Sequence, residues 1–378
     1  MEFRDLKKQY LNNKDAFDKA ISQVISEVNF ISGKEVTLLE ESLANFVGVK
    51  HCITCANGTD ALSMVLTVWN VGPGDAVFVP NFTFFATAEV VAYVGATPIF
   101  VDIDEKTFNM DPIHLEKQIL SVITSSNLKP KVIIPVDLFG LLADYEKIEN
   151  IARKYNLLLL EDGAQGFGAE WKGRKACSFG NAATTSFFPA KPLGCYGDGG
   201  AIFTNDDNLA LRLNSYKVHG KGDSKYDNVV VGVNSRLDTL QAAVLIEKLH
   251  VFTDFEMIAV QDIYNHYTTR LKEYVITPFI PENYISSFAQ YTIQLRSKCE
   301  RDSIQLFLKS KGIPTMIYYN KTMANQKAFS YLNNNDIEYP ISSKIVDKVL
   351  SLPFHPYLTL DEITFVTDSV IDFLKDNR

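Results

Sequence analysis

The chain has 378 residues, and its 37 Lys and Arg against 45 Asp and Glu give a formal net charge of −8 at pH 7. Hydrophobic residues make up 46% and charged residues 22%, which is typical of a globular protein of two or three domains and excludes collagen-like, coiled-coil and disordered chains. An acidic chain has no general basic surface for phosphate backbones, so we expect no nucleic-acid partner.

The cysteines and the N-terminus indicate a cytoplasmic protein. Five cysteines are too few, and odd in number, for a disulfide framework. Cys52 and Cys55 lack a second ligand pair for zinc, so we expect no metal site. The charged N-terminus is not a signal peptide, and no apolar stretch is long enough to span a membrane.

In chain order, the pattern begins with helices over about 14–48 that are interrupted at Gly33. Short apolar strands then alternate with helical segments, which indicates a buried, mostly parallel sheet with helices on both faces. The strands are expected at 51–55, 76–79, 97–101, 132–136, 157–160 and 201–204, and the helices at 60–70, 84–94, 113–122 and 144–154.

The pattern changes after about residue 205, where a helix and a polar loop over 220–234 precede a long helix over 237–274. Shorter extended and helical segments follow, which is typical of a small α+β domain. We therefore expect a large domain over 1–245 and a small domain over 246–378. The later elements are expected at 290–295, 300–311, 315–319 and 360–375.

The first strand end carries a glycine and a hydroxyl at a helix start. In an open parallel sheet, ligands bind beyond the carboxyl ends of the strands. The segment Asn57-Gly58-Thr59-Asp60 follows the strand over 51–55. It is either an anion cradle at a helix N-terminus or an ordinary helix cap.

Two further strand ends carry an aromatic ring and a carboxylate. Phe84 follows the strand over 76–79, where it either fills the core or stacks on a planar ring. Asp162 follows the strand over 157–160. A carboxylate is costly to bury without a partner, so Asp162 is either a helix N-cap or the partner of a protonated ring nitrogen.

Lys191 stands between an apolar run and a glycine-rich turn, an unusual place for a surface lysine. A desolvated lysine has a lowered pKa and forms Schiff bases with carbonyl compounds. Ser186, five residues earlier, is a candidate ligand for a phosphate oxygen.

These four features together require a ligand with a phosphate, a flat pyridine ring, a protonatable ring nitrogen and an aldehyde. Pyridoxal 5′-phosphate (PLP) has all four, and a lysine with an aspartate at the ring nitrogen is its usual binding pattern. The sequence contains no Gly-x-Gly-x-x-Gly after the first strand and no P-loop motif, which disfavours nicotinamide and P-loop nucleotides.

Over essentially its whole length, the sequence resembles the DegT/DnrJ/StrS group of fold-type I, PLP-dependent nucleotide-sugar aminotransferases. Within this group it is most similar to enzymes acting on UDP-2-acetamido-2-deoxy-3-oxo-D-glucuronate for bacterial surface polysaccharides. The segments that carry the resemblance are 57–62, 80–87, 95–102, 135–140, 161–165, 186–191 and 232–236.

The resemblance implies a role for each site residue in a homodimer with shared active sites. Lys191 would bind PLP covalently and move the proton, and Asp162 would keep the ring nitrogen protonated. The remaining cofactor contacts would be Gln165 at the ring hydroxyl, Phe84 on the ring face, and Gly58, Thr59, Asp60 and Ser186 at the phosphate. Asn234 would reach the phosphate in the neighbouring subunit, and Arg236, Tyr318 and Tyr319 would contact the sugar. For Asn234 and Arg236, the start of a helix is the structural alternative.

Two residues depart from the pattern of the similar enzymes. Tyr318 stands where they carry histidine, and Asp137 stands where a neutral residue or histidine is more common. An extra carboxylate near a uronate is unfavourable. Both changes therefore leave open an acceptor with a neutral C6, such as UDP-3-oxo-N-acetylglucosamine or a dTDP-3-oxo-6-deoxy sugar.

The resulting expectation is an aminotransferase that moves an amino group from L-glutamate to C3 of a UDP-linked 3-oxo sugar. A sugar dehydratase of the same group would carry histidine at the lysine position, so Lys191 argues against it. The alternative of another class is a regulatory protein that keeps the fold without catalysis. Intact Lys191 and Asp162 argue against that alternative.

Overall fold

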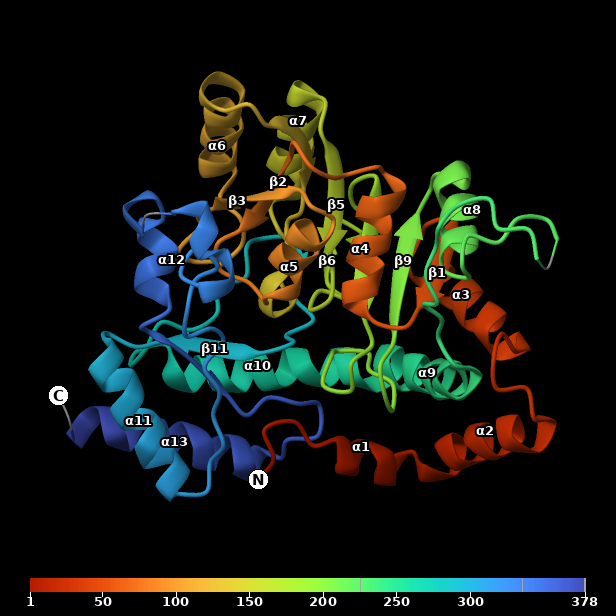
Figure 1. The fold of residues 1–378 in the computed structure, drawn as a ribbon. Coiled ribbons are helices and arrows are strands. Elements are labelled where there is room, and N and C mark those ends of the chain that lie inside the picture. The colour runs from red at the N-terminus through yellow and green to blue at the C-terminus, as the bar shows by residue number, and fades with distance from the viewer. Residues whose placement is uncertain (225, 335, 377–378) are drawn as a thin grey trace.

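A computed structural model describes residues 1–224, 226–334 and 336–376 (Figure 1). Its centre is a seven-stranded sheet in the order β1-β9-β8-β5-β4-β2-β3. The antiparallel pairs are β1 with β9 and β9 with β8, so within this sheet β9 alone runs against the others. The strands are β1 His51–Cys55, β2 Asp75–Pro80, β3 Thr97–Val101, β4 Lys129–Ile133, β5 Leu158–Asp162, β8 Ala182–Ser186 and β9 Gly200–Thr204.

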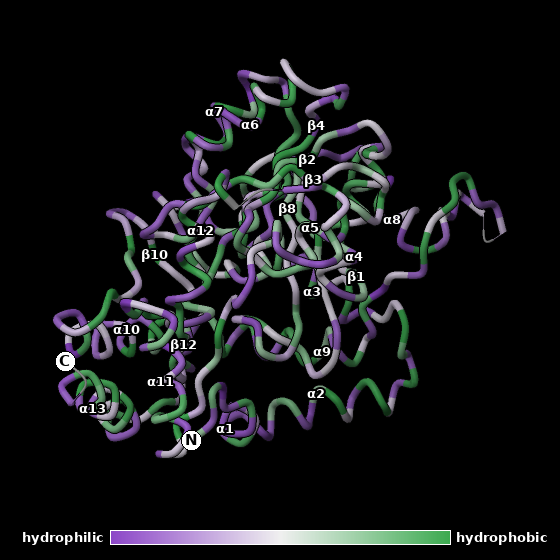
Figure 2. The backbone as a smooth tube through the Cα atoms, turned by 60° about the vertical axis from the view of Figure 1, so that its left-hand side comes forward, coloured by the Kyte–Doolittle hydropathy of each residue, from purple (hydrophilic) through white to green (hydrophobic). Residues whose placement is uncertain are grey.

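Helices cover both faces of the sheet because successive strand residues point to opposite sides. Val77 and Val79 pack with α4, α5 and α8, whereas Ala76 and Phe78 pack with α6 and α7. Helices α3 and α9 pack on the β9 end of that second face. Figure 2 shows hydrophobic residues along β2 and β4, inside these two layers. The helices are α3 Lys34–Val47, α4 Gly58–Val68, α5 Ala86–Tyr93, α6 Pro112–Ser125, α7 Tyr145–Tyr155, α8 Asp207–Tyr216 and α9 Thr239–Val251.

The second half of the chain has its own core below the sheet, built on a long interrupted helix. Helix α9 continues through a π turn, Phe252–Glu256, into α10, Met257–Leu271, so the expected long helix is one helix with a wider turn inside it. The other elements are β11 Tyr291–Gln294, α11 Lys298–Ser310, α12 Pro340–Ile345, β12 Val349–Leu352 and α13 Leu360–Asp376.

The chain ends and the connections complete the fold. Helices α1, Leu6–Asn12, and α2, Lys14–Glu27, run along the base of the molecule in Figure 1. Helix α1 begins near the start of α13, and α2 packs on α9. The short strands β6, β7 and β10 form a separate sheet. The short elements are β6 Glu170–Trp171, β7 Arg174–Lys175, β10 Tyr284–Ile285, η1 Leu138–Gly140, η3 Lys327–Leu332 and η4 Asp336–Glu338.

The structure differs from the expected elements in three places. Strand β8 is an additional central strand of small and hydroxyl residues, and β12 is an additional strand paired with β11. The segment 315–319 forms no strand, only one isolated bridge between Met316 and Ser351. The predicted domain boundary at 245/246 falls inside α9, so this boundary stays a prediction.

Among the described residues, none of the helices combines the length and the apolar character that a membrane crossing needs. The same residues contain no group of three or more His, Cys, Asp or Glu side chains placed to hold a metal ion.

Candidate active site

The residues predicted to bind the cofactor, apart from Asn234, come from the ends of four strands that run in the same direction. Strand β1 leads into α4 and Thr59, β2 precedes Phe84, and β5 ends at Asp162. Strand β8 ends at Ser186, five residues before Lys191. Because β5, β8 and the central parallel strands share one orientation, their carboxyl ends meet at one edge of the sheet.

The start of α4 and the end of β8 form an anion cradle. The N–H groups of Gly58 and Thr59 have no acceptor within the described part of the chain. A methyl group added at Gly58 would lie 2.8 Å from Ser186 Cβ and 3.4 Å from its Oγ, so only glycine fits this approach. Free N–H groups at a helix N-terminus, with a hydroxyl beside them, suit a phosphate group.

Asp60 has two hydrogen-bond partners within the chain. Its N–H donates to the side chain of the cap residue Asn57 at 2.8 Å, and its carboxylate accepts a hydrogen bond from Ser235 Oγ at 2.6 Å. Ser235 is fully buried and also accepts a hydrogen bond from Ala56 N at 3.0 Å. Asp60 therefore fastens the segment 232–236 to the start of α4, a contact that the sequence pattern did not reveal.

Asp162 is buried at the end of β5. Its Oδ2 accepts a hydrogen bond from Thr87 Oγ1 at 2.8 Å, and its Oδ1 accepts one from Ala164 N at 3.2 Å. Burial raises the pKa of Asp162, while these two donors and the charge of Lys191 oppose the rise. A buried carboxylate of this kind is stabilised by a cationic partner, such as a protonated ring nitrogen.

Lys191 is half-buried in the turn that follows β8. Burial lowers the pKa of its amine to about 8, Asp162 opposes this shift, and the charge of Arg4 assists it. About one amine in ten is then neutral at pH 7. Within the described residues, the Lys191 ammonium has no hydrogen-bond or ion-pair partner, so it is available to a carbonyl carbon.

Gln165 connects the cofactor side of the site to an aromatic wall. It is buried, its Oε1 accepts a hydrogen bond from Phe139 N at 2.9 Å, and its Nε2 donates to Tyr319 Oη at 3.1 Å. The Tyr319 ring lies 6.4 Å from the ring of Phe84 between centroids. Phe84 is 54% exposed, so one face of its ring is open to a planar ligand. Tyr318 packs against Phe3 at the edge of this wall.

The structure does not bring Asn234 and Arg236 into hydrogen bonds with the other predicted residues of the described chain. Asn234 is exposed and Arg236 is half-buried. Asn234 forms an isolated β-bridge with Val218, and Arg236 follows two residues later. This bridge lies at the base of an arm, described over 219–224 and 226–234, that Figure 1 shows projecting from the body beside α8. The roles of Asn234 and Arg236 across a dimer interface stay predictions.

Asp137 is not on the sugar side, and the interpretation that placed it near the acceptor is wrong. It is fully buried and accepts hydrogen bonds from Tyr145 Oη at 2.9 Å and Ala143 N at 3.1 Å. Burial raises its pKa to about 7, and burial also raises the pKa of the adjacent Glu161. Asp137 Oδ2 has no donor among the described residues, which suits one proton shared by the two carboxyl groups.

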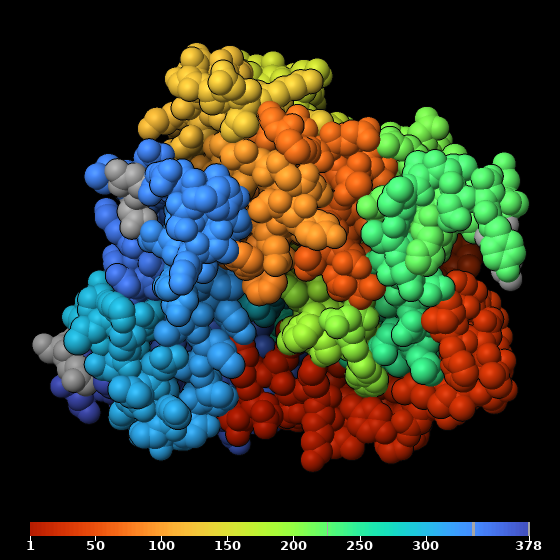
Figure 3. Space-filling view, viewed as in Figure 1, coloured from red at the N-terminus to blue at the C-terminus, as the bar shows by residue number. Residues whose placement is uncertain are grey.

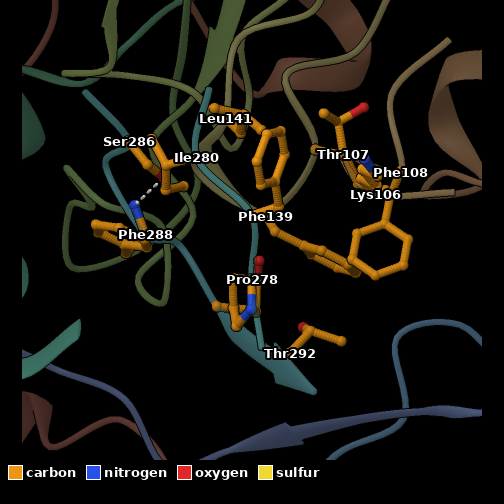
Figure 4. Close-up of a pocket in the computed structure, with 13 residues that line it drawn as sticks. Lys106, Thr107, Phe108, Phe139, Leu141, Pro278, Ile280, Ser286, Phe288 and Thr292 are labelled. Atoms are coloured by element: carbon orange, nitrogen blue, oxygen red, sulfur yellow. Dashed lines mark hydrogen bonds between the residues drawn. The ribbon is translucent and has the colours of Figure 1, made fainter. Parts of the chain in front are cut away.

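A separate pocket lies behind the aromatic wall (Figure 4). Phe108, Phe139 and Leu141 approach it from one side, and Pro278, Phe288 and Thr292 from the other. None of the predicted site residues lines this pocket.

The residues at the sheet edge fit PLP. The glycine-bounded cradle suits its phosphate, buried Asp162 suits its ring nitrogen, and the unpartnered Lys191 amine suits its aldehyde. Phe84 and Gln165 then flank the position of the ring. Thr87, Ser235 and Arg4 were given no role from the sequence, although Thr87 and Ser235 lie within segments that carry the family resemblance.

Comparison with known proteins gives relatives along almost the whole chain. The chain is 47% identical over 367 residues, 97% of its length and 98% of the relative's, to a UDP-2-acetamido-2-deoxy-3-oxo-D-glucuronate aminotransferase of Pseudomonas aeruginosa. It is 40% identical over 377 residues, 98% of both chains, to a pleiotropic regulatory protein of Geobacillus stearothermophilus.

A solved structure and a family description agree with these relatives. The crystal structure of a DegT DnrJ EryC1 StrS aminotransferase from Brucella abortus matches with a TM-score of 0.96 and 46% identity, covering 99% of both chains. Residues 12–371 match the DegT/DnrJ/EryC1/StrS aminotransferase family, whose members use PLP. This chain belongs to the DegT/DnrJ/EryC1/StrS family of sugar aminotransferases, and PLP is its cofactor.

Proposed function

We propose that this aminotransferase transfers an amino group from L-glutamate to C3 of a UDP-linked 3-oxo sugar of the UDP-2-acetamido-2-deoxy-3-oxo-glucuronate type, for bacterial surface polysaccharides. The observation that carries the proposal is the meeting of Lys191, Asp162 and the Gly58 cradle at one sheet edge. The similarity to the Pseudomonas aeruginosa aminotransferase supports this choice of acceptor.

The chain's own groups have distinct roles in this proposal. PLP, when bound, supplies the electron sink that makes the Cα–H bond of the amino donor acidic. Lys191, with its lowered pKa, takes that proton and returns it during amino transfer. Asp162 holds a proton on the ring nitrogen, and the Gly58 and Thr59 N–H groups with Ser186 hold the phosphate.

Tyr318 is compatible with a second candidate acceptor that has a neutral C6. A phenol at this position donates a hydrogen bond to a carboxylate or to a hydroxymethyl group, so Tyr318 does not select a uronate by charge. The burial of Asp137 removes the other objection, because its carboxylate does not face the open site. The uronate therefore remains the first choice, and a UDP-3-oxo-N-acetylglucosamine or a dTDP-3-oxo-6-deoxy sugar remains the second.

A homodimer with shared active sites is part of the proposal. Val229, Val230 and Val231 on the projecting arm are 61%, 52% and 95% exposed. Phe30 and Phe188 are also exposed, at 42% and 52%. Three consecutive exposed valines on a projecting segment form an apolar surface of the kind that another chain covers. In such a dimer, Asn234 and Arg236 at the base of the arm would complete the partner's site.

The acceptor is tested by turnover with 3-oxo sugars that carry carboxylate, hydroxymethyl or methyl at C6. We expect the carboxylate sugar to give the highest kcat/KM. If only the other sugars react, the uronate proposal is wrong. Borohydride trapping followed by peptide mapping is expected to place the cofactor on Lys191.

A stopped-flow half-reaction with glutamate separates an enzyme from a regulatory protein. We expect glutamate to bleach the visible band of the bound cofactor within a single turnover. A chain that binds PLP but never converts it to the amine form with any amino donor would support the regulatory alternative.

A further inference from the structure

Two cationic side chains hold the two ends of the turn that carries Lys191. Arg4 Nη2 donates a hydrogen bond to the Lys191 carbonyl at 2.8 Å, and Lys248 Nζ donates one to the Gly194 carbonyl at 2.7 Å. The first cation comes from the N-terminal segment and the second from α9. Figure 3 shows the N-terminal residues packed directly against the segment around residue 190.

Glu256 is the anion whose charge acts on both cations, although neither Arg4 nor Lys248 lies within ion-pair distance of it among the described residues. Lys248 and Glu256 are 2% and 3% exposed, and buried charges of this kind require partners. Glu256 lies in the π turn between α9 and α10, where the wider turn changes which residues share a helix face. Its negative charge supports the charged forms of Arg4 and Lys248, whose pKa values burial lowers.

The N-terminal segment is fastened to this network at several points. Glu256 Oε1 accepts hydrogen bonds from Gln9 Nε2 and from Tyr357 Oη, each at 2.7 Å. Lys8 Nζ donates to the Tyr357 carbonyl at 2.7 Å. The Phe3 carbonyl accepts a hydrogen bond from Phe354 N at 3.2 Å. The segment is therefore fixed on both sides of Arg4.

We propose that Arg4 is a positioning residue for Lys191: its guanidinium fixes the Lys191 carbonyl and places a positive charge close to the Lys191 amine. This inference rests on the proposed role of Lys191. A nearby positive charge favours the neutral amine, which is the form that attacks a carbonyl carbon. The N-terminal segment is then part of the active site.

Other titratable groups also lie near Arg4 and Lys191. Asp162 opposes Arg4 at the Lys191 amine. Tyr357, Tyr318 and His355 lie around Arg4, in addition to Glu256. Burial raises the pKa of both tyrosines, and burial lowers the pKa of His355 to about 4, so all three are neutral near pH 7. Near neutral pH, the fixed charges that act on the Lys191 amine are therefore those of Asp162 and Arg4, and Glu256 acts on Arg4 in turn.

The test measures the Lys191 amine itself, in the full chain with PLP removed. The rate of Lys191 labelling by trinitrobenzenesulfonate is followed against pH by peptide mass spectrometry. We expect Arg4→Gln to raise the midpoint of the profile by about half a unit, a loss of roughly threefold in labelling rate near pH 7. We expect Arg4→Lys, which keeps the charge, to recover most of that rate.

Arg212→Gln is the matched control, because Arg212 also donates to a backbone carbonyl, that of Val68, but lies on α8. Its labelling profile is expected to match the wild type. If the Arg4→Gln profile also coincides with the wild type, the proposal is wrong.

Glu256→Gln gives a second test with the opposite sign. Removing the negative charge of Glu256 leaves the positive charges of Arg4 and Lys248 uncompensated. We therefore expect the pH midpoint of Lys191 labelling to fall. Loss of packing alone would move both variants in the same direction, and that outcome would overturn the proposal. If Arg4→Gln does not fold, the test rests on Glu256→Gln alone. An unchanged or raised pH midpoint of Lys191 labelling in that variant would then contradict the proposed role of Arg4. Trapping of PLP on a residue other than Lys191 would contradict the proposed function instead.

Discussion

The two sides of the site are built differently. On the cofactor side, the cradle, Asp162 and Lys191 follow strands of one sheet, and hydrogen bonds from several distant segments hold them. On the side where we propose that the sugar binds, Tyr318 and Tyr319 belong to a segment outside the strands, and Asn234 and Arg236 lie at the base of the exposed arm. The side held by the sheet is the one that fits PLP, the cofactor of the family.

The largest effect on the cofactor side is expected from replacing Lys191. Lys191→Ala removes the amine that binds the cofactor and moves the proton, so we expect the glutamate half-reaction to slow by about 10³-fold or more. Stopped-flow absorbance measures it. Lys175→Ala, a lysine paired with Glu170 on the surface, is the control. A Lys191→Ala protein that keeps a tenth of the wild-type rate would contradict the assignment.

Asp162→Asn tests the electron sink on the same side. The amide cannot hold the ring nitrogen protonated, so we expect kcat to fall by about 10²-fold or more, with the sugar KM little changed. Thr87 Oγ1 still has an oxygen to which it donates, so the fold should persist. A change confined to KM would place Asp162 outside the reacting centre.

Gly58→Ala probes the cradle by shape alone. The added methyl would lie 2.8 Å from Ser186 Cβ, so α4 or β8 must shift, and we expect PLP affinity to fall by about tenfold. Titration of the PLP-free chain measures this affinity. Gly72→Ala, whose nearest atom would be 3.6 Å away, should leave the affinity unchanged.

The buried carboxyl groups of Asp137 and Glu161 predict that the stability of the fold depends on pH. The pKa of Asp137 rises to about 7 in the fold, whereas an unfolded aspartate titrates near 4. The folded state therefore binds more protons between about pH 4 and pH 7, and stability falls as pH rises through this window. We expect Asp137→Asn to lose less stability than the wild type between pH 5 and pH 8, with a difference in unfolding free energy on the order of 1–3 kcal/mol. Thermal unfolding at both pH values checks it, and equal slopes for the two proteins would refute it.

The smallest effect is expected on the sugar side. Tyr319→Phe removes the hydroxyl that accepts the Gln165 hydrogen bond, a contact worth about 1 kcal/mol. We expect kcat/KM for the sugar to fall several-fold, with the glutamate half-reaction nearly unchanged. Equal rate losses in the glutamate and sugar half-reactions would show that Tyr319 does not act on the sugar half-reaction alone.

The sequence indicated which residues gather at the sheet edge because Thr59, Asp162 and Ser186 are tied to local motifs at strand ends. Strand β8 was missed because its Ala-Ala-Thr-Thr-Ser composition has no apolar run, and only pairing with β5 and β9 makes it central. Thr87, Ser235 and Arg4 were missed because their partners lie 75 to 187 residues away in the chain. The position of Asp137 was misjudged because its side-chain face depends on packing against Tyr145.

The hydrogen bond between Ser235 and Asp60 has a thermodynamic consequence. It joins the base of the arm to the helix start that receives the phosphate, so the two regions cannot rearrange independently. If the arm binds a second chain, linkage requires reciprocity: association that orders the arm strengthens cofactor binding, and cofactor binding strengthens association by the same factor. PLP binding and dimer formation would then be thermodynamically coupled, so each could be followed by measuring the other.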